Sequence, residues 1–152
     1  MNRFEAWTTH TATLLVGGTG LVYAWMRYLV HPADPFAVVN HPLQPCVQHL
    51  HILVAPLLVF AAGLTWHQHA WPYWRRRVKR HRRSGTSMIF TLVPMVVSGY
   101  LIQTAVDAGW RRTWVIVHLA ASGLWLVVYL AHQAPALWRR RRSYLRPTSD
   151  QR

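Results

Sequence analysis

The stretch TWVIVHLAASGLWLVVYLAHQAPALW, residues 113–138, decides the fold. It is apolar and long enough to cross a bilayer as a helix, which needs roughly 20 residues. Two histidines interrupt it, His118 and His132. Histidine inside a membrane span is costly unless it has a partner. The stretch therefore predicts a membrane helix that carries functional side chains.

Three further apolar stretches of similar length precede it, at about residues 6–30, 48–71 and 86–105. Trp and Tyr, which favour the headgroup level of a bilayer, lie near the ends of these stretches. No stretch alternates with period two, as a barrel strand would. We expect an all-α fold: an integral membrane four-helix bundle that forms a single domain over residues 1–152.

Charge predicts how this bundle is oriented. The 152 residues are 52% hydrophobic and 14% charged, with a net charge of +13. The basic residues gather in residues 75–83 and in the tail, 139–152, whereas residues 31–47 contain no Lys or Arg. Such blocks indicate the cytoplasmic side of a membrane rather than nucleic acid, and they also suit anionic lipid. We expect a multi-pass membrane protein, with both termini cytoplasmic and residues 31–47 and 107–112 outside; the bacterial inner membrane is implied by the resemblance described below.

The spacing of the two histidines in the fourth stretch predicts a cofactor. His118 and His132 are fourteen residues apart, so their rings project from nearly one helix face, with a rise of about 21 Å between them. This separation suits two haems, one near each membrane surface. Each iron needs a second axial nitrogen from another helix at equal depth. The single cysteine, Cys46, excludes the paired-cysteine signature of covalent haem attachment.

The topology suggests which histidines complete the two pairs. At the outer level, His51 in the second stretch matches the depth of His118, and His49 is the alternative. At the inner level, His10 in the first stretch can meet His132. His69 is the alternative there, because it lies about five turns from His51 on the same face.

His69 could instead lie beside the inner haem and bind a quinone, with Gln68 and Trp66 supplying a donor and an aromatic wall. Arg27, near the outer end of the first stretch, is a candidate partner for a haem propionate, or it reaches to the membrane surface. We expect no ligation from the remaining four histidines, His31, His41, His67 and His81.

Small residues at mid-depth admit two interpretations. They could give room for a porphyrin, or they could allow close helix packing, which favours small residues in membranes. They are Gly17, Gly18, Gly20, Gly63, Ser98, Gly99 and residues 120–123.

The chain resembles the di-haem cytochrome b subunits of bacterial formate dehydrogenases and nickel–iron hydrogenases, and the wider bacterial cytochrome b561-like group. In that family one His comes from the first helix, one from the second, and two spaced by fourteen from the fourth. His10, His51, His118 and His132 fall into those places, and the resemblance covers about residues 7–138. It implies a non-catalytic electron-transfer subunit with two b-type haems, acting across the bilayer between a quinone pool and an extracytoplasmic partner.

Two other functions remain open from the sequence. A metal-ion transporter or metal-binding membrane protein could use the same histidines, although the apolar stretches contain no carboxylates to balance a hard cation. A membrane anchor without cofactor would leave the fourteen-residue spacing to chance. For the electron-transfer function we expect a hetero-oligomeric complex with a periplasmic redox subunit, such as a c-type cytochrome.

Overall fold

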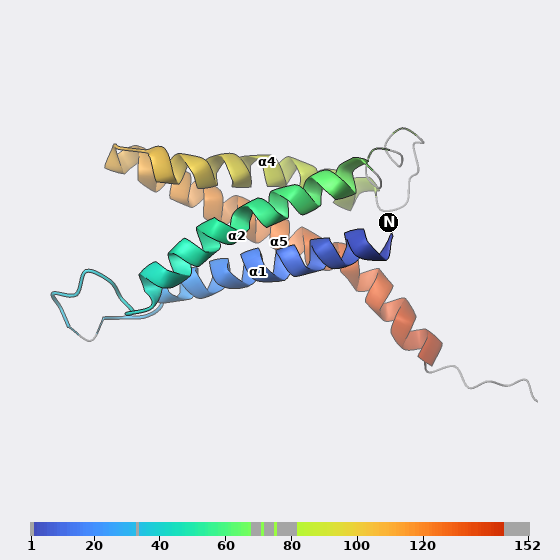
Figure 1. The fold of residues 1–152 in the computed structure, drawn as a ribbon, viewed down its shortest axis with the longest axis horizontal. Coiled ribbons are helices and arrows are strands. Elements are labelled where there is room, and N and C mark those ends of the chain that lie inside the picture. The colour runs from blue at the N-terminus through green and yellow to red at the C-terminus, as the bar shows by residue number, and fades with distance from the viewer. Residues whose placement is uncertain (1, 33, 68–70, 72–74, 76–81, 145–152) are drawn as a thin grey trace, which may run out of the picture. The chain divides into compact units, whose positions relative to one another are not determined.

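The computed structural model describes residues 2–32, 34–67, 71, 75 and 82–144. These residues form α1 (Arg3–Tyr28), α2 (Gln44–Thr65), α4 (Arg82–Thr104) and α5 (Ala108–Tyr144), coloured from blue to red along the chain in Figure 1. The prediction of an all-α protein with four helices is confirmed for the described part of the chain.

The chain divides into two compact units, and each contains one helical hairpin. Unit 1 is Met1–Arg77, in which α1 packs against α2. Unit 2 is Val78–Arg152, in which α4 packs against α5. The histidines of interest are divided evenly, since His10 and His51 belong to unit 1 and His118 and His132 to unit 2.

Local hydrogen bonds explain where α1 begins and ends. The Asn2 side chain accepts from the backbone N–H of Glu5 at 2.8 Å, and the Glu5 carboxylate accepts from the N–H of Asn2 at 3.2 Å. This capping box starts the helix three residues before the predicted position. Beyond its end, Asn40 donates its side-chain amide to the carbonyl oxygen of Arg27 at 2.8 Å, which fastens the connection to the helix.

The second helix also begins earlier than predicted. Pro45 lies in its first turn, where the missing N–H of proline costs no hydrogen bond. The α-helix ends at Thr65 rather than Trp71, and Trp66 and His67 continue it as a π-helical turn.

The prediction that residues 107–112 connect the last two helices is wrong, because residues 108–112 are helical; that this end faces outward stays a prediction. Only residues 105–107 separate α4 from α5. The carboxylate of Asp107 accepts from the backbone N–H of Trp110 at 2.8 Å and so caps the new helix. At its other end α5 continues to Tyr144, so the first residues of the predicted tail are helical too.

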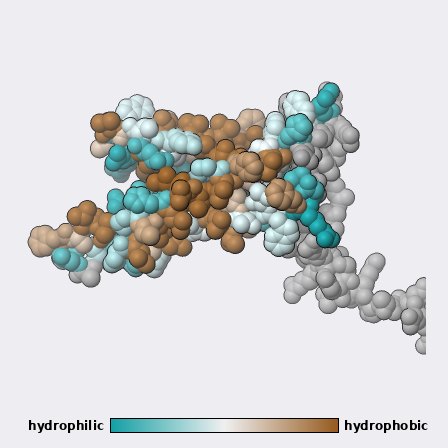
Figure 2. All heavy atoms as spheres, in the orientation of Figure 1, coloured by the Kyte–Doolittle hydropathy of each residue, from teal (hydrophilic) through white to brown (hydrophobic). Residues whose placement is uncertain are grey.

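Within the part of the chain that the structure describes, three helical segments are long and apolar enough to cross a membrane: Gln44–Thr65, Ser87–Thr104 and Ala108–Ala134. Large apolar side chains are exposed on them, among them Leu53 at 76% and Phe90 at 73%. Figure 2 shows hydrophobic residues over the middle of the helices and hydrophilic ones near their ends. These features indicate a multi-pass membrane protein in a lipid bilayer. The fourth helix, α1, is long enough, but its Thr and Gly residues lower its hydropathy, so its span stays a prediction.

The cap of α5 can be tested by substitution. Replacing Asp107 by Ala removes the acceptor for the Trp110 N–H and should lower the free energy of unfolding by about 1 kcal/mol. Asp107→Asn keeps an acceptor and should lie close to the wild type. Thermal unfolding in detergent, followed by circular dichroism, measures both variants; equal loss in the two would contradict a capping role.

Candidate functional site: histidines held between paired helices

In unit 1, the imidazole of His51 lies against one turn of α1. Its Nδ1 atom is 3.1 Å from the hydroxyl oxygen of Thr19. A Cβ atom added to Gly20 would lie only 2.9 Å from Cε1 of the His51 ring. The ring therefore lies against the hydroxyl of Thr19 and in the space left by the absence of a side chain at Gly20.

The hydrogen bonds of Thr19 indicate the tautomer of His51. The hydroxyl has one hydrogen, and it lies 2.7 Å from the carbonyl oxygen of Leu15, which can only accept. With its hydrogen used there, the Thr19 oxygen accepts from Nδ1 of His51. A neutral ring that carries its hydrogen on Nδ1 has its lone pair on Nε2.

In unit 2, His118 is held in the same way by α4. Its Nδ1 atom lies 2.9 Å from the carbonyl oxygen of Met95 and 3.3 Å from the hydroxyl of Ser98. Because a carbonyl oxygen only accepts, Nδ1 of His118 is the donor and Nε2 again has the lone pair. A Cβ atom on Gly99 would lie 3.2 Å from Cε1 of the ring.

The two hairpins thus contain the same local arrangement. Each first helix supplies a hydroxyl residue followed by glycine, and each second helix supplies a histidine whose Nδ1 meets that hydroxyl. Both hydroxyls also bond the carbonyl oxygens three and four residues earlier in their own helix. Among the small residues noted in the sequence, Gly20, Ser98 and Gly99 lie against a histidine ring. Thr19 was missed.

A second level lies further along unit 1. The hydroxyls of Thr9 and Thr65 are 3.0 Å apart, so they join α1 to α2 one residue from His10. Thr9 lies ten residues before Thr19 in α1, and Thr65 lies fourteen residues after His51 in α2. These steps correspond to about 15 and 21 Å of helix rise. His10 therefore lies well removed from His51 along the hairpin.

In unit 2 the fourteen-residue step lies within one unbroken helix. His118 and His132 are half-buried, and the buried side chains of Ala121, Trp125 and Tyr129 follow between them at three- and four-residue intervals. Trp125 and Tyr129 stack with ring centroids 5.4 Å apart. The α5 face that carries both histidines is thus filled by a small residue and two stacked aromatic rings.

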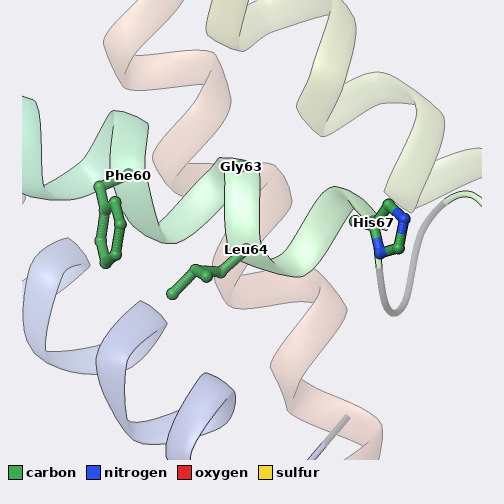
Figure 3. A pocket seen from close by; sticks show the side chains of 4 residues that line it. All are labelled: Phe60, Gly63, Leu64 and His67. Atoms are coloured by element: carbon green, nitrogen blue, oxygen red, sulfur yellow. The ribbon is translucent and has the colours of Figure 1, made fainter.

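The other candidate residues are placed differently. His49 and Arg27 are exposed. His69 and Gln68 lie outside the described residues, and Trp66 packs against Trp71 with the rings tilted by 40° and their centroids 6.2 Å apart. An open hollow beside α2 is lined by Phe60, Gly63, Leu64 and His67, as Figure 3 shows.

Over residues 2–32, 34–67, 71, 75 and 82–144, no three His, Cys, Asp or Glu side chains gather into a group that could hold a metal ion. A bis-histidine haem iron takes two protein ligands, fewer than such a group. Each predicted pair, His51 with His118 and His10 with His132, takes one ring from each unit and stays a prediction.

Comparisons with protein-family models, with curated proteins and with solved structures found no match.

The contact between Gly20 and His51 predicts unequal effects of two neighbouring substitutions. Gly20→Ala forces the ring or the helices apart and should cost about 1–3 kcal/mol of stability. Gly18→Ala is the matched control, because a Cβ atom there would meet nothing within 4 Å. Thermal unfolding in detergent compares the two, and equal stability would contradict the close approach.

Proposed function

We propose that this chain is a membrane electron-transfer subunit that carries two b-type haems, one ligated by His51 and His118 and the other by His10 and His132. The observation that carries the proposal is the orientation of His51 and His118. Both rings donate Nδ1–H to a neighbouring helix, which is the arrangement that metal-ligating histidines adopt so that Nε2 can bind the metal.

The donor set and its spacing along the helices fit this cofactor. Neutral imidazole is the usual axial ligand of b-type haem iron. Gly20 and Gly99 leave room against the two rings, where any Cβ atom would press on Cε1. The fourteen residues between His118 and His132 give a rise of about 21 Å, which leaves space for one haem at each level.

Bis-histidine haem iron exchanges single electrons and has no open position for a substrate. The protein's own part is to hold and orient the ligands and to exclude water. The buried Trp125 and Tyr129 fill the α5 face between the two histidine levels. We propose that α1 is the fourth span, with its His10 at the inner level.

The ends of the helices would meet the redox partners. We propose a quinone at the inner end, near His69 and Trp66 and the hollow beside His67. At the outer end, a periplasmic redox subunit such as a c-type cytochrome would exchange electrons with the outer haem. Both termini would be cytoplasmic, in a bacterial inner membrane, and the chain would belong to a hetero-oligomeric complex.

Haem content tests the ligand assignment directly. Reduced-minus-oxidised spectra of the purified protein should show b-type bands with two haems per chain. His51→Ala and His118→Ala should each lose the same haem, and His10→Ala and His132→Ala the other. His49→Ala is the matched control on the exposed side of α2 and should keep both.

Other outcomes of that measurement would contradict the proposal. Zinc or copper without iron would indicate a metal-ion protein, and no metal at all would indicate an anchor subunit. Loss of haem in His49→Ala but not in His51→Ala would exchange the two residues as outer ligand.

The quinone site has a kinetic test. His69→Ala should slow quinol-dependent haem reduction while both haems stay bound, because a donor to the quinone is lost. His67→Ala, at the hollow beside α2, is the comparison: an equally slow haem reduction there would mean that the helix end matters rather than His69 in particular. Unchanged reduction rates in His69→Ala would remove that residue from the site.

A further inference from the structure

We propose that Thr19 and Ser98 are positioning residues: their hydroxyls hold the Nδ1–H of His51 and His118 and so set the redox potential of the iron that these rings ligate. This inference rests on the proposed function and deepens it, since it assigns a role to residues that act through the ligands. It also assigns Gly20 and Gly99 the role of admitting each ring to its hydroxyl.

The geometry that supports this inference occurs twice. A single contact between a hydroxyl and a histidine would be ordinary helix packing. Here the same ring atom, Nδ1, meets a hydroxyl in both hairpins, at 3.1 Å from Thr19 and 3.3 Å from Ser98. In both, the next residue is a glycine against Cε1 of the same ring. This shared geometry does not come from a longer sequence repeat, because the residues before the two hydroxyl–glycine pairs differ: Gly18 in α1 and Val97 in α4.

Each hydroxyl donates its hydrogen within its own helix and can therefore accept one from the histidine ring. Thr19 donates to Leu15 O at 2.7 Å, and Ser98 donates to Pro94 O at 2.6 Å. A hydroxyl whose hydrogen is committed in this way offers only its lone pairs to the ring, and hydrogen bonds in such a chain strengthen one another. Ser98 is also 1% exposed, so water does not compete there.

The consequence for the ligand is electronic. When Nδ1–H donates a hydrogen bond, electron density on Nε2 rises and the ring becomes a more basic ligand. A more basic ligand favours the more positively charged, oxidised iron, which lowers the midpoint potential. His118 has the Met95 carbonyl as a second acceptor, which stays in place when the Ser98 hydroxyl is removed.

Redox titration of the purified full-length protein tests the proposal. Thr19→Val keeps the size of the side chain and removes the acceptor, so one haem should shift to a higher midpoint potential while the other is unchanged. Thr19→Ser should restore the wild-type value. Ser98→Ala should produce a shift in the same direction and on the same haem, because His51 and His118 would ligate one iron.

Thr8→Val is the matched control. Its hydroxyl bonds the Phe4 carbonyl oxygen of its own helix at 2.8 Å, so its loss should leave both potentials unchanged. Three results would overturn the proposal: no shift in Thr19→Val, an equal shift in Thr19→Ser, or shifts of Thr19→Val and Ser98→Ala on different haems.

A second readout does not depend on haem. Nitrogen-15 chemical shifts of histidine side chains, measured on the same full-length protein, report which ring nitrogen carries the hydrogen. The His51 signal, assigned by its loss in His51→Ala, should indicate Nδ1–H in the wild type and lose that preference in Thr19→Val. If the protein contains no haem but the His51 signal still changes in Thr19→Val, the proposed function is refuted, whereas Thr19 still holds the Nδ1–H of His51. If the His51 signal is the same in both proteins, that role of Thr19 is refuted.

Discussion

The structure depends on how a polar imidazole is accommodated between two apolar helices. Away from water, a ring N–H without an acceptor costs on the order of 1–3 kcal/mol. Helix backbones offer few acceptors, because most carbonyls are already bonded within the helix. His51 uses the hydroxyl of Thr19, and His118 uses the second lone pair of the Met95 carbonyl together with Ser98. This requirement fixes which turns of each helix pair lie opposite one another.

Matching positions in α2 and α5 show where the two hairpins differ. After each histidine, buried or half-buried residues follow on the same face, with Leu58 and Ala61 in α2 and Trp125 and Tyr129 in α5. Fourteen residues further on, α5 has His132, whereas α2 has Thr65, which pairs with Thr9 of α1. The hairpins are thus alike at one level. At the other, unit 1 carries its histidine on the opposite helix, as His10.

The sequence predicts features that depend on a single helix, and it does not predict contacts that depend on how two helices are aligned. Apolar length and the fourteen-residue step between His118 and His132 follow from the helix period, and the helices occur where expected. Helix ends were misplaced where short-range hydrogen bonds decide them, as at Asp107. The role of Thr19 depends on the register between α1 and α2, which composition does not encode. The available signal was the hydroxyl–glycine dipeptide, Thr19–Gly20 in α1 and Ser98–Gly99 in α4, but the same dipeptide also occurs at Ser84–Gly85 and Ser122–Gly123 and so does not single out the two contacts.

The same register accounts for polar side chains that keep α1 from having an apolar window like those of α2, α4 and α5. Its Thr8, Thr9 and Thr19 hydroxyls each donate to a backbone carbonyl oxygen of their own helix, so their polar atoms are satisfied inside the protein. A hydropathy scale counts these groups as though each had to be transferred unpaired into lipid, where an unpaired hydroxyl costs several kcal/mol. Hydropathy therefore overstates the cost of these three hydroxyls, whereas the buried Thr13 hydroxyl, which has no hydrogen-bond partner within the described part of the chain, keeps its cost. The side chains that lower the hydropathy of α1 include Thr9, Thr19 and Gly20, the residues through which α1 contacts Thr65 and His51 of α2.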